Sequence, residues 1–584
     1  MAGARVGFVT LQPQKLPLLG RTGGFKLCCF GVADGFEHAQ TRQANEPARR
    51  DRGGRRRGWP PWPGACGARR PAQSNHDAVI TEQEFDRLAS EGFGRIPLVL
   101  EAWADLETPL SLYLKLAHAD SGGRNSFLLE SVVGGERFGR YSFIGLPART
   151  WLRASGWGAQ ARTEVVRDGV VAETLAGNPL DAIDAYLRRA RVALPAGMPR
   201  FCGGLAGYFG YDTVRHIERK LQASCPPDPL GLPDILLLQT EELAVIDNVA
   251  GRLYLIVYAD PAQPQAYAAA RQRLQELRAR LHEPARAPAV APSAVQPVQR
   301  ERTPEDFMAA VEEAKRLIQQ GDFMQIVIGQ RLHKAFAHSP LALYRALRSL
   351  NPSPYMYYYN LSGAAQPGRD LHVIGASPEI LVRQERVAEG VKVTIRPLAG
   401  TRPRGATPEQ DKAAERELLA DPKERAEHVM LIDLARNDIG RIAQIGTVKV
   451  TEAFAVERYS HVMHIVSNVE GLLRPGLTSM DVLRATFPAG TLTGAPKVHA
   501  MELIDRLEPV KRGIYGGAVG YLSWGGEMDL AIAIRTGVVL DGTLYVQAAA
   551  GVVADSAPAS EWQETEHKAQ ALLRAAQWVE EGGL

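Results

Sequence analysis

The sequence predicts an α+β protein built on antiparallel sheets, and two observations support this. From about residue 95 onward, apolar runs of strand length alternate with amphipathic runs of helix length. Towards the C-terminus, AVGYLSW, LAIAIRTGVVL and TLYVQAAAGVV follow one another as a meander, and Asp541-Gly542 forms a hairpin turn between the last two. Because consecutive hairpins pair strands antiparallel, a doubly wound parallel sheet is excluded.

The elements follow in order along the chain. ITEQEFDRLASEG predicts a helix capped by Thr81, with Phe85 and Leu88 at helical spacing. A strand at 253–258 precedes a helix over roughly 262–282. The Pro/Ala-rich stretch 283–303 is expected to be a surface linker between a region at 79–282 and a second mixed block at 304–584.

Composition excludes several classes of protein. Of 584 residues, 45% are apolar and 23% are charged, and no run of about 18 apolar residues is present, so no membrane partner is expected. Five cysteines in so long a chain do not make a disulfide framework. A reducing, cytoplasmic location is therefore the expectation.

Residues 1–78 differ from the rest of the chain. They hold thirteen Lys/Arg and five Asp/Glu, and they are rich in Gly and Pro. Such a segment buries little and is expected to be disordered. It could be a nucleic-acid-binding arm, a transit peptide, or a sequence upstream of the native start. The third interpretation is favoured, so no nucleic acid is expected as a partner.

A helix over 420–440 carries the first candidate site residue. Glu427 precedes Leu431 and Leu434 by four and seven residues, which places its carboxylate on the apolar face. A buried carboxylate needs a partner, a proton or a metal ion. A buried salt bridge with Arg436 or Arg441 is the alternative.

Two further segments carry charged groups in suggestive positions. On a helix beginning near Ser560, Glu561, Glu564 and Lys568 share one face; the alternative is a surface ion pair. In AIAIRTG, which reads as one strand, Arg535 lies among small neighbours, and this favours a cavity that receives a carboxylate. A structural salt bridge is equally compatible.

The loop PAGTLTGAPK at 488–497 resembles an anion-binding loop but fails the spacing of a nucleotide phosphate loop. His464 has no accompanying Cys/His set, so zinc is not expected. The candidate segments together supply carboxylates, an arginine, a lysine and Gly-Thr loops. This combination suits a site for a hard metal ion and a small anionic substrate.

These stretches together resemble the chorismate-utilising enzymes, most closely the family of anthranilate synthase large subunits. LLES, PSPYMYY, GASPE, RPLAGTRPRG, DPKERAEHVMLIDLARND, YSHVMHIVSNVEG, FPAGTLTGAPK, YGGAVGY, AIAIRT and EWQETEHKA occur in family order from about residue 80 to the C-terminus. The resemblance implies two subdomains around an antiparallel β-sandwich. It also implies Mg²⁺ held by Glu427 and Glu564, with oxygen ligands and retained waters.

The resemblance further implies the substrate and the catalytic groups. Chorismate and ammonia would give anthranilate and pyruvate, with Glu379 as the acid that protonates the departing hydroxyl, His464 tied to pyruvate elimination, and Gln325 where water-adding relatives have a lysine. The apolar flanks of Glu379 are expected to raise its pKa. Positions matching chorismate-binding residues are Gly400, Thr401, Thr493, Gly494, Tyr515, Arg535, Ala549, Ala550, Gly551 and Lys568.

Partners and regulation are also implied. The chain lacks the activated-cysteine elbow of an amidotransferase, so use of glutamine is expected to require a separate glutamine amidotransferase subunit, component II. Ser131, Pro354, Tyr355 and Met356 match a tryptophan site, which implies feedback inhibition in tryptophan biosynthesis. An aminodeoxychorismate synthase subunit is the alternative, but Ala399 replaces the nucleophilic lysine of those relatives.

Overall fold

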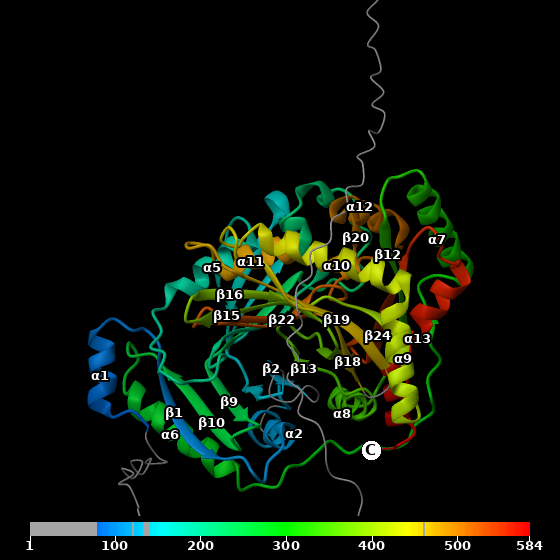
Figure 1. The fold of residues 1–584 in the computed structure, drawn as a ribbon. Coiled ribbons are helices and arrows are strands. Elements are labelled where there is room, and N and C mark those ends of the chain that lie inside the picture. Colours follow the sequence, from blue (N-terminus) through cyan, green and yellow to red (C-terminus); the bar gives the residue numbers. More distant parts are fainter. Residues whose placement is uncertain (1–78, 120–121, 132–138, 460–461, 584) are drawn as a thin grey trace, which may run out of the picture. The chain divides into compact units, whose positions relative to one another are not determined.

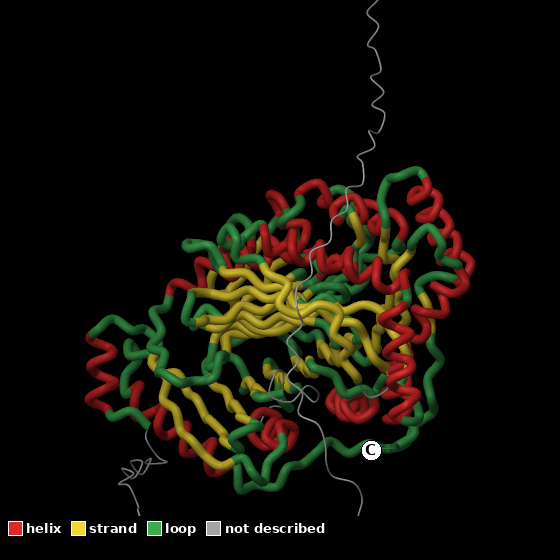
Figure 2. Tube along the Cα trace, viewed as in Figure 1, coloured by secondary structure: helices red, strands yellow, loops and turns green. Residues whose placement is uncertain are grey.

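The computed structural model describes residues 79–119, 122–131, 139–459 and 462–583 (Figure 1). The predicted disordered tract 1–78 lies outside the described residues. The described residues belong to one compact unit. Its named strands belong to two 12-stranded sheets, and every strand pair among the described residues is antiparallel. Figure 2 shows the strands in the interior and helices around them, which confirms the α+β class.

The first sheet contains the two neighbouring strands whose backbone carries most of the groups proposed to contact the substrate. Its order is β1 (Ile96–Trp103), β10 (Arg252–Ala259), β9 (Glu242–Asp247), β3 (Tyr141–Gly145), β2 (Ser126–Glu130), β13 (Tyr355–Asn360), β14 (Leu371–Ser377), β23 (Thr536–Leu540), β24 (Thr543–Val552), β12 (Gln325–Ala335) and β11 (Gln299–Arg300), with β20 (Gly494–Ala495) on β12.

The second sheet also has 12 strands and packs against the first. Its order is β17 (Leu398–Pro403), β19 (Val462–Leu472), β16 (Gly390–Ile395), β15 (Ile380–Val387), β22 (Met528–Ile532), β21 (Ala518–Ser523), β7 (Gly204–Phe209), β8 (Ile235–Thr240), β4 (Thr150–Ser155), β5 (Arg162–Arg167) and β6 (Val170–Leu175), with β18 (Lys449–Arg458) on β19.

Both predicted regions contribute strands to both sheets. β2 from the first region pairs with β13 from the second, and β7 pairs with β21. The stretch between the regions has little regular structure apart from β11. The proposed boundaries therefore divide the sequence but do not divide either sheet.

The predicted C-terminal meander is wrong in one respect, because its strands belong to different sheets. β21 and β22 form a hairpin in the second sheet, whereas β23 and β24 form a hairpin in the first. LAIAIRTGVVL is therefore two strands, and Arg535 lies at the crossover with φ of +50°. Both strands are buried along their length, so the sequence shows one continuous apolar run and gives no sign of the break between them. The Asp541-Gly542 turn is confirmed, with φ of +49° and +79° as a type I′ turn requires.

Helices begin where the sequence supplies capping groups. The Thr81 side chain accepts from the amide of Glu84 at the start of α1 (Glu82–Ser90), as predicted, and Asp421 caps α10 (Pro422–Gly440). The other α-helices are α2 (Pro109–Tyr113), α5 (Pro179–Arg189), α6 (Ala266–Arg280), α7 (Pro304–Gln319), α8 (Pro340–Leu350), α9 (Pro408–Ala420), α11 (Ser479–Thr486), α12 (Lys497–Leu507) and α13 (Pro558–Glu580). Shorter turns are η1 (Leu114–His118), η2 (Gly158–Gln160), η3 (Tyr211–His216), η4 (Arg219–Gln222) and η5 (Gly490–Leu492).

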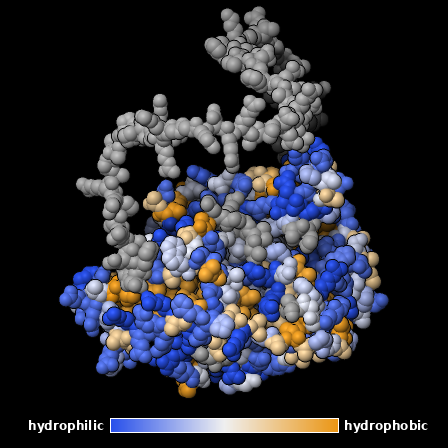
Figure 3. Space-filling model, turned by 90° about the horizontal axis from the view of Figure 1, so that it is seen from below, coloured by the Kyte–Doolittle hydropathy of each residue, from blue (hydrophilic) through white to orange (hydrophobic). Residues whose placement is uncertain are grey.

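An aromatic cluster packs one sheet onto the other. Phe143 on β3 packs edge-on against Tyr521 on β21, and Phe201 stacks on Tyr521 with ring centroids 4.3 Å apart. Among the described residues no helix is both long and apolar enough to cross a bilayer. The face in Figure 3 intersperses hydrophilic and hydrophobic residues.

Candidate active site

Glu427 on α10 has neither of the arginine partners considered from the sequence. Arg436 pairs instead with Asp433 at 3.2 Å, and Arg441 donates to the carbonyl of Ala485 at 3.4 Å. The Glu427 carboxylate is half-buried and accepts a hydrogen bond from the Gln325 side chain. The alternative of a salt bridge with Arg436 or Arg441 is therefore wrong, and the carboxylate is available for another role.

Several carboxylates crowd around Glu427. Burial raises its pKa, and the negative charges of Glu424 and Glu564 raise it further. Burial and Glu564 also raise the pKa of Glu561. Such crowding is unfavourable unless protons or a cation neutralise it.

This donor set fits a hard divalent ion. The described residues contain no group of three or more His, Cys, Asp or Glu side chains placed to hold a metal ion. Mg²⁺, however, keeps several waters and is usually bound by one or two carboxylates together with substrate oxygens. Glu427 and Glu564 fit such a set, and the Mg²⁺ site remains a prediction.

Lys568 connects helix α13 to strand β24. Its Nζ forms an ion pair with Glu564 at 2.6 Å and donates to the carbonyl of Ala549 at 2.8 Å. The i,i+4 ion pair considered from the sequence is therefore present. Because the same lysine also reaches the backbone of β24, the pair lies at the edge of the site and not on a remote helix surface.

Glu379, between β14 and β15, is a buried carboxyl group. Burial raises its pKa to about 8, although a hydrogen bond from Thr491 and the charge of Lys568 act in the opposite direction. The Thr491 hydroxyl donates to Oε1 at 3.1 Å. The predicted rise in pKa is confirmed, and the group is protonated at neutral pH. Thr491 was missed because its contact joins residues far apart in sequence.

A small cavity of about 40 Å³ adjoins Glu379. Leu431 and Leu434 of α10 line it, together with Asp438, whose carboxylate pairs with Lys497 at 2.9 Å. The apolar walls on this side explain why the Glu379 carboxyl group is poorly hydrated and holds its proton.

His464 on β19 has its tautomer set by its neighbours. Its Nδ1 lies 3.0 Å from the carbonyl oxygen of Gly400 and 3.0 Å from the Thr401 hydroxyl. A carbonyl only accepts, so Nδ1 carries the proton and Nε2 keeps a free lone pair. Burial lowers the pKa of His464 to about 4, which keeps the ring neutral and able to accept a proton.

Arg535 lies half-buried at the crossover between the two sheets. It forms no ion pair with any described residue, so the structural salt bridge considered from the sequence is wrong. Burial lowers its pKa, while the nearby Tyr515 and Glu564 act to raise it. A half-buried guanidinium without a carboxylate partner favours binding of an anion.

Strands β12 and β24 bring the remaining candidates together. Ala549, Ala550 and Gly551 pair with residues 329, 328 and 327, and the amide of Ala549 donates to the Tyr515 hydroxyl. A Cβ at Gly551 would lie 3.0 Å from Nε2 of Gln325, so these two residues are neighbours.

The 488–497 loop is tied to the same strand. The Thr493 hydroxyl donates to the carbonyl of Ala489 at 3.1 Å, so it is engaged within the loop. Gly494 has φ of +147°, and a Cβ there would lie 2.2 Å from the carbonyl oxygen of Gln325. Substrate binding by Thr493 and Gly494 remains a prediction.

The predicted tryptophan-site residues meet where β2 pairs with β13. Met356 is opposite Glu130, which brings Ser131 next to Tyr355 and Pro354. Glu130 is buried and forms an ion pair with Arg348, with Nε at 2.6 Å. The two segments come from different regions of the sequence, as predicted.

Comparison with known proteins identifies the family. Residues 141–574 match the chorismate binding enzyme family. The chain is 55% identical over 507 residues to anthranilate synthase component 1 of Neisseria meningitidis serogroup A, covering 86% of this chain and 99% of that protein. Its counterpart in Pseudomonas aeruginosa is 53% identical over 517 residues, with 86% and 99% covered.

Solved structures indicate the same family as the sequence comparison. Anthranilate synthase component I from Streptococcus pneumoniae matches with a TM-score of 0.65 and 35% identity, covering 81% of this chain and 99% of that chain. The menaquinone-specific isochorismate synthase of Escherichia coli shares the fold, with a TM-score of 0.60, 20% identity, and 85% and 98% covered. By sequence and by fold, the chain belongs to the chorismate binding enzymes and, within them, to the anthranilate synthase component 1 family.

Proposed function

We propose that this chain converts chorismate and ammonia to anthranilate, pyruvate and water. The observation that carries the proposal is Arg535, a half-buried cation without an ion-pair partner among the described residues. Its charge acts directly on the neutral base His464. Glu564 lies near Arg535 and pairs with Lys568, whose charge acts on the neutral acid Glu379. The identity to anthranilate synthase component 1 proteins supports the same substrate.

Each of the site residues has a separate role in the proposed reaction. Arg535 and Tyr515 bind a substrate carboxylate, and Mg²⁺ held by Glu427 and Glu564 would neutralise the other. Glu379 gives its proton to the 4-hydroxyl, which leaves as water while ammonia adds at ring carbon 2. The ammonium formed at carbon 2 gives one proton back to the Glu379 carboxylate. Nε2 of His464 then accepts the proton of carbon 2 as the bond between ring carbon 3 and the enolpyruvyl oxygen breaks, and a proton returned to the methylene carbon of the released enolpyruvate gives pyruvate. Loss of that proton makes the ring aromatic.

The direct test mixes purified protein with chorismate, Mg²⁺ and ammonium and follows the fluorescence of anthranilate. Product should form with ammonium, whereas glutamine should support it only when a glutamine amidotransferase subunit is added. Product from glutamine and this chain alone would contradict the need for that partner. A 4-amino product would instead favour the aminodeoxychorismate synthase alternative, which Ala399 argues against.

Replacing Arg535 separates substrate binding from stability. Arg535→Met should raise the chorismate KM about 10- to 100-fold, since a hydrogen bond to a charged group contributes about 1.5–3 kcal/mol. Its Tm should equal or exceed that of the parent, because no described carboxylate loses its partner.

Arg383→Met is the matched control. Arg383 is likewise half-buried, but it is paired with Asp529 at 2.8 Å, so its loss leaves an uncompensated charge and should lower Tm. If Arg535→Met loses as much stability as Arg383→Met, Arg535 has a structural role.

We also propose that tryptophan inhibits the enzyme at Ser131, Pro354, Tyr355 and Met356. The support is their proximity at the end of the β2–β13 pair. An indole needs an apolar slot, and its charged head group needs polar partners. A ligand at a seam between two regions of the chain shifts their equilibrium by its differential affinity.

Ser131→Leu should fill the position of the head group. Activity measured with ammonium should match the parent without tryptophan and should persist at tryptophan concentrations that inhibit the parent. A variant with the parent's sensitivity would place the inhibitory site elsewhere.

A further inference from the structure

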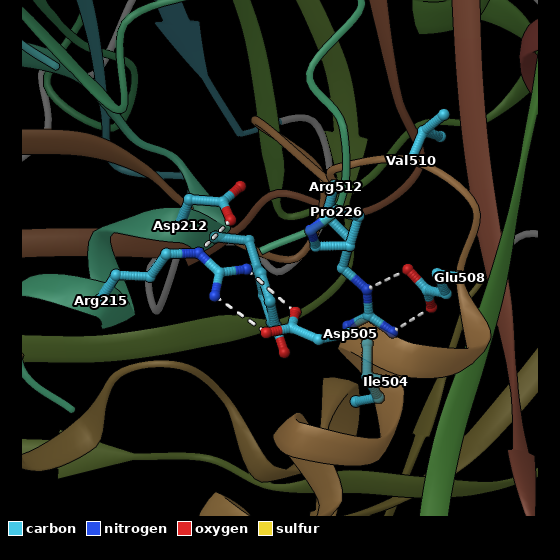
Figure 4. Close-up of a pocket in the computed structure, with 9 residues that line it drawn as sticks. Asp212, Arg215, Pro226, Ile504, Asp505, Glu508, Val510 and Arg512 are labelled. Atoms are coloured by element: carbon cyan, nitrogen blue, oxygen red, sulfur yellow. Dashed lines mark hydrogen bonds and ion pairs between the residues drawn. The ribbon is translucent and has the colours of Figure 1, made fainter. Parts of the chain in front are cut away.

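Two buried arginine–carboxylate clusters lie beside each other near α12 (Figure 4). Arg215 on η3 bonds Asp212 and Asp505, and it also donates to the carbonyl of Leu221. Arg512 bonds Glu508. Both arginine side chains are only 1% exposed, but their remaining contacts differ.

The other N–H donors of Arg512 form hydrogen bonds with backbone carbonyls near the site. Its Nη1 donates to Leu492 at 2.7 Å, and its Nη2 donates to Val327 at 2.9 Å. Glu508 holds the guanidinium through both oxygens, and its Oε1 also accepts the amide of Gly329 at 2.7 Å. One ion pair therefore connects the η5 loop to strand β12.

Each anchored residue is adjacent to a proposed site residue. Leu492 lies between Thr491, which bonds Glu379, and Thr493. Val327 follows Gln325 by two residues and pairs with Gly551. Tyr515 follows Arg512 by three residues.

We infer that Arg512, held by Glu508, is a positioning residue: it fixes the Leu492 carbonyl relative to β12 and thereby holds the Thr491 hydroxyl on the carboxyl group of Glu379. The inference rests on the proposed function and adds a role for a side chain that does not touch substrate. A planar fork suits this task because it reaches several acceptors in fixed directions, whereas lysine presents a single ammonium group.

Arg512→Lys keeps the charge but cannot bond Leu492, Val327 and both Glu508 oxygens together. We expect kcat to fall at least about 10-fold while the chorismate KM changes less than about 3-fold. The alkaline limb of the kcat profile should move to higher pH. Thr491 and Lys568 hold down the pKa of Glu379. Asp438, which is paired with Lys497, lines the same cavity, and Tyr459 lies within electrostatic reach of Glu379. Of these contacts, only that of Thr491 should change.

Thr491→Val should shift the alkaline limb in the same direction, and adding Arg512→Lys to it should cause no further shift. Arg215→Lys is the matched control: an equally buried arginine whose loss should lower Tm but leave the limb in place. Glu508→Gln provides the same test if Arg512→Lys does not fold, because it weakens the hold on the guanidinium.

A normal alkaline limb in Arg512→Lys and Glu508→Gln, with activity losses no greater than in Arg215→Lys, would overturn the positioning role. Additive limb shifts in the double variant would also overturn it. If the parent itself makes no anthranilate, the proposed function fails, which is a different result.

Discussion

Glu427→Gln is expected to abolish anthranilate formation at every Mg²⁺ concentration while the protein stays folded. The substitution removes one of two carboxylates proposed to hold the ion, and we expect a loss of at least about 100-fold, since even outer groups of metal sites alter affinity or activity by 10- to 100-fold. Because Glu427 lies near Glu424 and Glu564, removing its charge relieves repulsion. Without Mg²⁺ the variant should therefore melt no lower than the parent.

The measurement pairs fluorescence assays with thermal melts across Mg²⁺ concentrations. Binding to the folded state raises the Tm of the parent, and this rise should be absent in Glu427→Gln. Asp433→Asn is the control on the same helix: Asp433 is exposed and paired with Arg436, so both readouts should match the parent. Full activity of Glu427→Gln in excess Mg²⁺ would contradict the metal assignment.

Glu379→Gln is expected to lower kcat by about 100- to 10,000-fold, the usual contribution of general acid catalysis. Glutamine keeps the size of the side chain and an oxygen that accepts from Thr491, so the chorismate KM should change little. In the parent, kcat should fall as pH rises through about 8, because the acid loses its proton there.

The stability of the parent should fall with rising pH in the same direction as its kcat. The pKa of Glu379 rises from 4.5 in the unfolded chain to about 8 in the folded protein, so between these values the folded state binds the extra proton. The stability of the parent therefore falls as pH rises through this window. Above pH about 8, Glu379→Gln should melt higher than the parent, because it buries no charge.

Glu385→Gln serves as the control for a carboxylate on the neighbouring strand. Glu385 is paired with Arg200 at 3.1 Å and is only partly buried, so its loss should leave kcat and its pH dependence unchanged. A normal kcat in Glu379→Gln, or a parent whose activity does not decline above pH 8, would contradict the assignment of Glu379 as the acid.

Much of the local structure followed from the sequence. Thr81 and Asp421 have side chains that accept amide hydrogens at helix starts, and both helices begin there. Asp541-Gly542 has residues that tolerate positive φ, and the hairpin lies there. The position of Glu427 on the apolar face of its helix predicted a buried carboxylate, and the structure shows one that is half-buried.

The sequence by itself determined the class of fold, the starts of the helices capped by Thr81 and Asp421, and the chemical types gathered in the site, because capping, turn geometry and periodicity act between residues close in the chain. Only the tertiary structure decided that the chain changes sheets at Arg535, that Thr491 bonds Glu379, and that Arg512 joins the η5 loop to β12. These contacts connect segments 20 to 185 residues apart. No local pattern encodes such contacts, since they depend on which buried surfaces meet when the two sheets pack.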